Sequence, residues 1–433
     1  VLLLCDPWTS AFPLTGREVE LARLWSLLDD VEVRSRPLTC LISGAAGMGK
    51  NLLLDAFRSR VKQHPVKVFV LLEVTCEPIR RDLPYAVLVE MIRLRAAVQE
   101  TDNAAQAREK LWRMVTQAFA RFGARKIGER ETNEARQVAD TIAATPAFDI
   151  DDPARTALSR TLSEEGRRAL TEALATYFQR LAMCNPVLIL VRNAQFLDQQ
   201  SRTFFTDLGK IVSGAPILVV ATASDFEQSS APRASLARRA ATSSEPLHAD
   251  VHLTLGQLSD PALDQLVREL LSAPVNSKLL RWLRDNARGN PFLAAELIAV
   301  LAATKGMKFS HAEWRVDREH LPDVVPGSIE SAVRQLIGTL PDTARTVLAG
   351  AVIIGRVFWL GALEALGLDE IKSSLELLVQ RGFITRTATS RYQRQPEYRL
   401  SSSLRWRVAY DLLPPRKRRK YHRNIAAWMV ERG

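Results

Sequence analysis

The fold is decided by residues 38–51, which read LTCLISGAAGMGKN. The first part, residues 38–43, is a short apolar run, which is typical of a buried parallel strand. The turn that follows contains three glycines and a lysine, Gly44, Gly47, Gly49 and Lys50. The segment after the turn, residues 52–61, has the apolar spacing of a helix. The stretch therefore predicts a strand, a glycine-rich turn and a helix in direct succession.

The turn matches the phosphate-binding pattern G-x-x-x-x-G-K-[ST] at every position except the last, where Asn51 stands. In this P-loop pattern the glycines let backbone N–H groups face phosphate oxygens, and the helix N-terminus favours the anion. The lysine, here Lys50, reaches the β- and γ-phosphates. A glycine-rich turn with a chance lysine is the alternative, but it would not explain three correctly placed glycines. The predicted nucleotide contacts of this segment are Gly44, Gly47, Met48, Gly49, Lys50, Asn51 and Leu52.

Further apolar runs resemble the first, at residues 66–74, 187–191, 217–221 and 251–255. Helical patterns separate them, and this alternation predicts an α/β fold with a doubly wound parallel sheet. In such a sheet the ligand binds at the carboxyl ends of the strands, which is where the P-loop lies. The predicted P-loop nucleotide-binding domain spans residues 1–258 and has a helical insertion at about residues 85–181.

The rest of the chain predicts two smaller domains. Residues 260–304 have helical spacing and predict a small helical domain that spans 259–325. Residues 326–433 contain three helical patterns followed by two short strand patterns, at 383–386 and 398–401. This order predicts a winged-helix domain, followed by the start of a C-terminal helical region. The middle of the helical insertion, residues 125–165, is rich in Ala, Arg, Thr and acidic residues and poor in aromatics, and it is expected to be the most mobile part. A second loose segment, residues 226–246, has the composition of a loop.

Composition and charge limit the classes of function. The chain has no run of eighteen apolar residues, so a membrane-spanning helix is not expected. A cytoplasmic location is expected instead. A net charge of +11 would permit binding to nucleic acid or an anionic surface, but charge bears on partners rather than on fold. No metal site is predicted, because the cysteines lie far apart and lack ligand spacing. They are Cys5, Cys40, Cys76 and Cys184, and they are interpreted as lone thiols.

Short segments outside the P-loop carry a family resemblance. They are FPLTGRE at residues 12–18, GNPF at 289–292, YRL at 398–400 and VAY at 408–410. Together with the P-loop they resemble the AAA-like ATPase core of the STAND class, as found in large LuxR-type regulators, some bacterial adenylyl cyclases and multidomain kinases. The resemblance implies that Arg17 lies near the nucleotide base and that Pro291 packs on adenine. The alternative for Pro291 is a simple helix stop and restart, since Gly and Pro punctuate helices.

The chain departs from the pattern of this class at positions used for metal and water. Its third strand ends in Arg192 and Asn193, where the resemblance implies two acidic residues that organise Mg²⁺ and the attacking water. Asn51 replaces the Ser or Thr that binds Mg²⁺, and its amide is a poorer ligand. Residues 221–225, after the fourth strand, lack the arginine that senses the γ-phosphate in this class. The departures predict a degenerate ATPase that binds nucleotide with little or no hydrolysis.

Two charged residues near the third strand have competing interpretations. The Arg192 guanidinium either replaces the metal charge beside the phosphates, or it forms a salt bridge or is exposed to solvent at the strand end, and both alternatives stay open. Asp198 lies six residues further on and is predicted to cap the next helix rather than to act in catalysis.

The expected function is that of a cytoplasmic signalling module that binds ATP or ADP as a conformational switch or structural ligand, with the need for Mg²⁺ left open. The expected partners are the adenine nucleotide and other protein domains or signalling proteins. The alternatives are an active ATPase with unusual magnesium ligands, a nucleotide-free scaffold, and a winged-helix DNA-binding protein of the origin-recognition kind. The basic run RKRRK at residues 416–420 would suit DNA phosphates, but a solvated helix face is the favoured interpretation.

Overall fold

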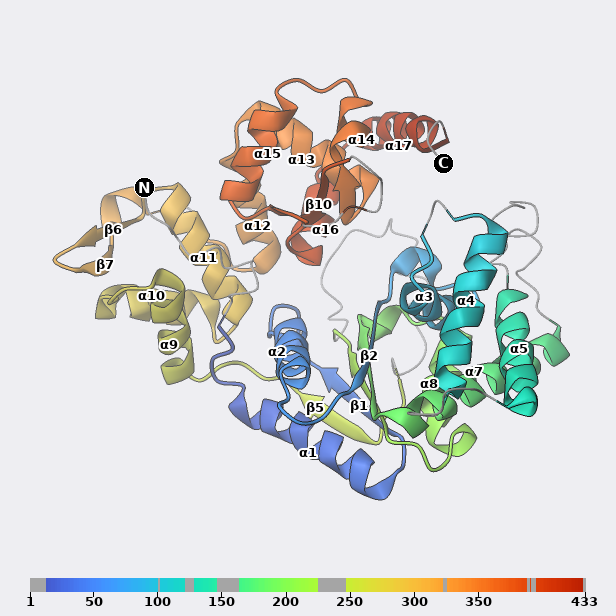
Figure 1. Cartoon of the computed structure of the whole chain (residues 1–433). Helices are drawn as coiled ribbons and strands as arrows, with labels where there is room; N and C mark the ends of the chain where they lie inside the picture. The colour runs from blue at the N-terminus through green and yellow to red at the C-terminus, as the bar shows by residue number, and fades with distance from the viewer. Residues whose placement is uncertain are drawn as a thin grey trace. The chain divides into compact units, whose positions relative to one another are not determined.

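A computed structural model describes residues 13–99, 102–120, 128–145, 163–224, 247–321, 325–387, 390 and 395–430 (Figure 1). The second loose segment predicted above, residues 226–246, lies outside these ranges, as do residues 125–127 and 146–162 of the first. The chain divides into two compact units, Arg17–Gly256 and Gln257–Gly433, and the second also includes the residues before Arg17. Among the helices described, none is both long and apolar enough to cross a membrane.

The first unit is built on a five-stranded sheet with the strand order β2-β3-β4-β1-β5. The strands are β1 Leu38–Ser43, β2 Val70–Thr75, β3 Val187–Arg192, β4 Ile217–Thr222 and β5 Val251–Thr254. Each strand pairs in parallel with its neighbours. β4 is buried along its whole length and β3 along all but its last residue, which explains their unbroken apolar sequences. The predicted α/β fold with a parallel sheet is confirmed.

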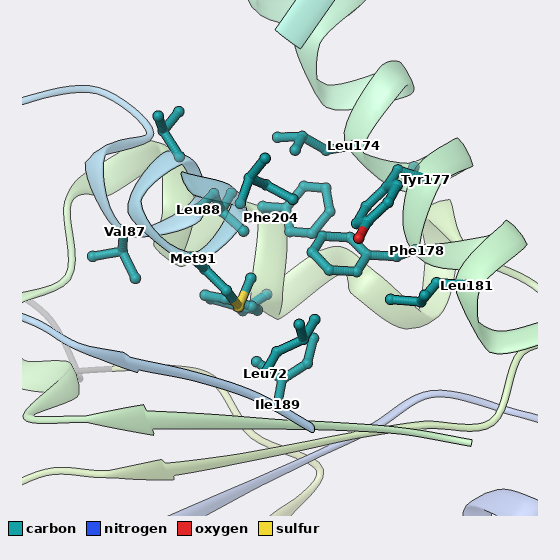
Figure 2. Close-up of a cluster of buried hydrophobic side chains, with 14 of the residues drawn as sticks. Leu72, Val87, Leu88, Met91, Leu174, Tyr177, Phe178, Leu181, Ile189 and Phe204 are labelled. Atoms are coloured by element: carbon teal, nitrogen blue, oxygen red, sulfur yellow. The ribbon is translucent and has the colours of Figure 1, made fainter. Parts of the chain in front are cut away.

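Helices cover this sheet and fill the connection between β2 and β3. The helices of the unit are α1 Glu18–Arg34, α2 Lys50–Lys62, α3 Ala86–Arg95, α4 Ala104–Phe119, α5 Glu129–Ala143, α7 Glu164–Cys184 and α8 Gln199–Ile211. Figure 2 shows Leu72 of β2 and Ile189 of β3 beneath the apolar side chains of α3, α7 and α8. Phe178 of α7 lies 5.8 Å from Phe204 of α8 between ring centroids. The helices inserted between β2 and β3 therefore share one hydrophobic core with the sheet.

The second strand begins later than the sequence predicts, at Val70 rather than at residue 66. Val66 and Val68 are β-branched, yet the two residues are 84% and 71% exposed. β-branched residues favour strands only where a pleated surface packs against neighbours, and these two have no such surface.

The second unit is mostly helical. Its helices are α9 Asp260–Leu271, α10 Ser277–Ala287, α11 Pro291–Ala303, α12 Ile329–Gly338, α13 Asp342–Ile354, α14 Leu360–Glu364, α15 Ile371–Gln380, α16 Ser403–Asp411 and α17 Pro415–Val430. Its strands are β6 Met307–Ser310, β7 Glu313–Val316, β8 Val357–Trp359, β9 Ile384–Arg386 and β10 Glu397–Leu400. The β6-β7 hairpin lies within the bounds of the predicted small helical domain, after the helical pattern at residues 260–304.

One hydrophobic cluster extends from α9 to α17, so the domain boundary predicted near residue 325 falls inside a single compact unit. β8, β10 and β9 form an antiparallel sheet in that order. Along the chain, α12, α13 and α15 precede β9 and β10, as the sequence predicts, whereas β8 is a further strand between α13 and α14 that was not predicted. The assignment of these elements to a winged-helix domain stays a prediction.

Candidate nucleotide-binding site

The P-loop connects the end of β1 to the start of α2 and contains three glycines with positive φ. These are Gly44 at 141°, Gly47 at 85° and Gly49 at 90°. A Cβ atom on Gly44 would lie 2.6 Å from the carbonyl oxygen of Leu255, so this position is closed to any side chain. A Cβ on Gly49 would meet nothing within 4 Å, so there the backbone conformation alone requires glycine.

Lys50 is the first residue of α2, and its side chain folds back over the loop. Its Nζ donates to the carbonyl oxygens of Gly44 at 2.6 Å and Ala45 at 2.8 Å. The residue is only 8% exposed. Its ammonium group therefore lies at the amino end of α2, where the helix dipole already favours an anion.

Arg17 joins the segment before α1 to this loop. One Nη of its guanidinium donates to the carbonyl oxygens of Met48 at 3.2 Å and Gly256 at 2.5 Å, and the other pairs with Glu20 at 3.0 Å. Its Nε is buried and has no hydrogen-bond partner among the described residues. The structure thus brings Arg17 and the P-loop together. Its role toward the base stays a prediction.

Pro291 belongs to the second unit, where it is the buried first residue of α11. The side chain of Asn290 caps this helix by accepting from the backbone N–H of Leu293 at 3.0 Å. Gly289 has a φ of 70°, and a Cβ there would lie 2.7 Å from the carbonyl oxygen of Leu258. Helix punctuation accounts for the local structure, and a contact between Pro291 and adenine stays a prediction.

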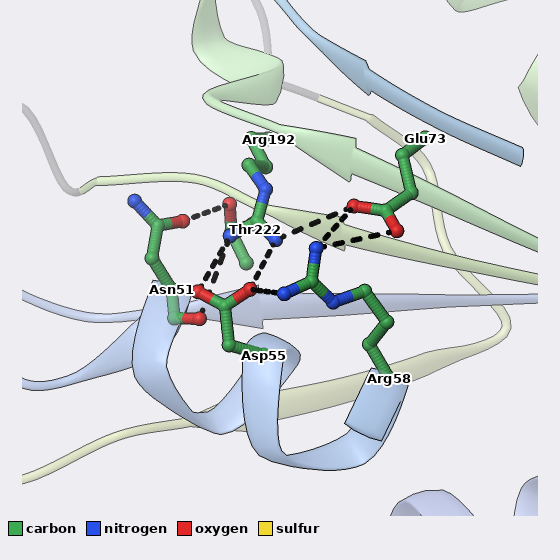
Figure 3. Close-up of polar contacts among 6 residues, drawn as sticks. All are labelled: Asn51, Asp55, Arg58, Glu73, Arg192 and Thr222. Carbon is green, nitrogen blue, oxygen red and sulfur yellow. Dashed lines mark hydrogen bonds and ion pairs between the residues drawn. The ribbon is translucent and has the colours of Figure 1, made fainter. Parts of the chain in front are cut away.

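At the end of β3, Arg192 forms the salt bridge that was one of its two interpretations (Figure 3). Its two Nη atoms lie 2.8 Å and 3.3 Å from the carboxylate oxygens of Asp55 on α2. One of them also lies 3.7 Å from Glu73 on β2. Arg58 lies 3.2 Å from each of these two carboxylates, so the four side chains form one ion-pair network.

A second polar chain holds Asn51, the residue in place of the P-loop Ser or Thr. The Thr222 hydroxyl at the end of β4 donates to Asn51 Oδ1 at 3.2 Å. The backbone N–H of Asn193 in turn donates to the Thr222 hydroxyl oxygen at 3.2 Å. Asn193 has a φ of 58°, a left-handed conformation that Asn tolerates better than most residues.

Sequence reasoning missed four members of these networks, namely Asp55, Arg58, Glu73 and Thr222. The three-residue spacing of Asp55 and Arg58 on one helix, and a charged Glu73 within an apolar strand, were the available signals. The prediction for Asp198 is confirmed. Its side chain caps α8 by accepting from the backbone N–H of Ser201 at 2.8 Å, and it also accepts from that of Tyr85 at 2.9 Å.

The basic run at residues 416–420 lies on α17, in the second unit. Residues 381–423 contain thirteen Arg and Lys and only two acidic residues, so this segment carries a net charge equal to the +11 of the whole chain. Arg418 covers the Tyr410 ring at 4.5 Å, measured from its guanidinium carbon to the ring centroid. The cations exposed on this helix that form no salt bridge with the residues described are Arg416, Lys417, Arg419, Lys420 and Arg423.

The P-loop residues fit the phosphates of a nucleotide, whereas the residues near them fit Mg²⁺ poorly. Positive-φ glycines, a helix N-terminus and the Lys50 ammonium supply donors and positive charge for an anion. The two positions where the resemblance implies acidic residues hold a guanidinium and an amide. The nearby carboxylates of Asp55 and Glu73 are already paired with arginine.

Comparison with known proteins gives a family for the P-loop region. Residues 13–220 match the family described as AAA ATPase domain. No curated protein sequence gives a significant match.

Solved structures similar to this chain include a STAND protein with a tetratricopeptide repeat sensor from Pyrococcus horikoshii. It is 10% identical with a TM-score of 0.45, and the match covers 98% of this chain and 47% of that one, so this chain spans about half its length. The Aeropyrum pernix ORC1 protein in complex with DNA is 16% identical with a TM-score of 0.38, covering 94% and 95% of the two chains. Cdc6p from Pyrobaculum aerophilum is 12% identical with a TM-score of 0.35, covering 97% of each.

The family match covers β1, the P-loop, β3 with Arg192 and most of β4. It confirms the resemblance to the ATPase core of the STAND class at the level of an AAA-like P-loop ATPase. Residues 13–220 of this chain therefore form an AAA-like P-loop ATPase domain.

Proposed function

We propose that this chain is a regulatory module that binds ATP or ADP as a conformational switch or structural ligand and hydrolyses it little or not at all. The observation that carries the proposal is the contrast within one site. The phosphate loop keeps its glycines and Lys50, while β3 ends in Arg192, which is held in a salt bridge with Asp55. Phosphate binding and hydrolysis use different residues, so one can be retained where the other is lost.

In this proposal the phosphates contact the backbone N–H groups of the P-loop and the Lys50 ammonium. The contact residues are Gly44, Gly47, Met48, Gly49, Lys50, Asn51 and Leu52. Arg17 is proposed on the base side of the site, supported by its bond to Met48 and by its buried Nε, which has no partner among the described residues. Pro291 is proposed as a further base contact on the strength of the resemblance alone. The signalling role and the protein partners also rest on the resemblance.

Binding of adenine nucleotide is expected in isothermal titration calorimetry with ATP and with ADP. Because a ligand that binds only the folded state stabilises it, a hundredfold excess over Kd is expected to add about 2.7 kcal/mol to the free energy of unfolding. Nucleotide that co-purifies is detected by mass analysis of the denatured protein. A chain that releases no nucleotide and gives neither heat nor a thermal shift at millimolar nucleotide would be a scaffold instead.

The DNA-binding alternative is supported by the concentration of the whole net charge in residues 381–423. Any binding to duplex DNA is expected to be independent of base sequence and to weaken steeply with salt, since exposed Arg and Lys contact phosphates. Fluorescence anisotropy with two unrelated duplexes over a salt series measures this. Replacing Lys417 and Lys420 by Ser is expected to make the plot of the logarithm of the binding constant against the logarithm of salt concentration less steep. The slope is expected to fall by about 1 for each phosphate that a lysine no longer neutralises. Sequence-selective binding that survives physiological salt would show a DNA-reading protein.

A further inference from the structure

The carboxylates of Asp55 and Glu73 near the P-loop are already neutralised by arginine. Arg192 lies 2.8 Å from Asp55 and 3.7 Å from Glu73, and Arg58 lies 3.2 Å from each (Figure 3). Two guanidinium groups thus face two carboxylates, and the network has no net charge. It offers a dication no electrostatic attraction beyond that of the nucleotide itself.

The oxygen atoms that remain are poor ligands for Mg²⁺. The ion needs nearly octahedral oxygen ligands, and protein sites for nucleotide-bound Mg²⁺ supply them through one or two carboxylates. Asn51 Oδ1 is a neutral amide oxygen that already accepts the Thr222 hydroxyl at 3.2 Å. An Arg192 Nη lies 3.5 Å from the backbone oxygen of Asn51, so a cation placed in the first turn of α2 would meet a guanidinium.

We propose that the site takes its nucleotide as the free polyanion, without a bound magnesium ion. Lys50, the N-terminus of α2 and the loop N–H groups provide positive charge for the phosphates. In this proposal the Arg192 network occupies the position beside the phosphates where a magnesium ion would otherwise lie. This inference rests on the proposed function, because it names the form of nucleotide that the same site binds. It also assigns Arg192 as a positioning residue that excludes the metal.

The test is calorimetry with ATP and with ADP, each in excess EDTA and over a series of Mg²⁺ concentrations. The apparent Kd is expected to be lowest in EDTA and to rise with Mg²⁺ as the free nucleotide is depleted. The rise is expected to be larger for ATP than for ADP, because ATP holds Mg²⁺ more tightly. A Kd that falls on addition of Mg²⁺ overturns the inference. Absence of binding in every condition contradicts the proposed function itself, so the two failures are distinguishable.

Variants at one position test the part played by Arg192. Arg192→Asp changes the charge of the network from zero to −2 and removes the guanidinium near Asn51, so Mg²⁺ is expected to tighten nucleotide binding to this variant. Arg192→Lys retains the positive charge and serves as the matched control, for which Mg²⁺ is expected to weaken binding as in the original chain. Thermal unfolding without nucleotide checks that each variant is folded.

If Arg192→Asp does not fold, Arg192→Gln replaces it. That variant leaves the network at −1, and a lower Kd in Mg²⁺ than in EDTA is expected. The inference is overturned if the Lys variant gains the same magnesium dependence as the Asp or Gln variant, because charge would then not be the cause. It is equally overturned if neither the Asp nor the Gln variant gains any such dependence.

Discussion

ATP hydrolysis by this chain is expected to be slower by on the order of a thousandfold or more than that of a P-loop ATPase with two acidic residues after its third strand. In P-loop enzymes, the loss of one group that stabilises the transition-state charge costs about 10³–10⁵ in kcat, and each tenfold corresponds to about 1.4 kcal/mol of barrier. Here the positions for metal and water are occupied by Asn51, Arg192 and Asn193. Arg192 is held by Asp55 at 2.8 Å, so its side chain is not positioned to activate water.

A phosphate-release assay measures this rate beside that of a triple variant, Asn51→Ser, Arg192→Asp and Asn193→Asp, which is expected to hydrolyse ATP faster. Aspartate tolerates the left-handed φ of 58° at residue 193, so the backbone there is compatible with the change. Lys50→Ala is the negative control. If the unmodified chain turns over ATP at the rate of an ordinary P-loop ATPase and Lys50→Ala abolishes that activity, other residues must supply the magnesium and water contacts.

Glu296→Ala is expected to lower the free energy of unfolding of the second unit by about 3–5 kcal/mol, because it leaves a buried charge on Arg405 without its partner. The two side chains are 0% and 2% exposed, and they form a bidentate pair at 2.9 Å and 3.0 Å. Arg405 also donates to the carbonyl oxygen of Gly382 at 2.7 Å and covers the Phe383 ring at 4.8 Å. The pair joins α11 to α16 within one core, and a loss of this size is a large part of the roughly 5–15 kcal/mol that stabilises a typical domain.

Urea unfolding followed by tryptophan fluorescence measures the effect. The matched control is Glu330→Ala, which breaks an exposed ion pair between Glu330 of α12 and Arg407 of α16, the helix that also carries Arg405. The side chains of Glu330 and Arg407 are 44% and 55% exposed. Exposed pairs contribute about 0.2–1 kcal/mol, so little change is expected there. A double variant, Glu296→Leu with Arg405→Met, is expected to recover much of the loss, since apolar replacement of a buried pair is often neutral. Equal effects of Glu296→Ala and Glu330→Ala would show that the buried pair contributes no more than a surface pair.

The sequence by itself determined the features that depend on contiguous residues. The strand, glycine turn and helix at residues 38–62 follow from apolar spacing and from the need for glycine at positive φ, and both are local properties. The parallel sheet follows from apolar runs that alternate with helices, because such strands must be covered on both faces. The cap at Asp198 is likewise local, since the capping side chain accepts from the backbone N–H of Ser201, only a few residues further along the chain.

Only the tertiary structure decided which distant side chains meet. Asn51 and Thr222 are 171 residues apart in the chain, Asp55 and Arg192 are 137 apart, and Glu296 and Arg405 are 109 apart. The first two contacts depend on the strand order that places β3 and β4 near α2, and hydrophobic periodicity carries no information about that order. The sequence therefore left the role of Arg192 open between a substitute for the metal and a salt bridge. The salt bridge forms because the fold brings Asp55 and Glu73 within reach of the end of β3.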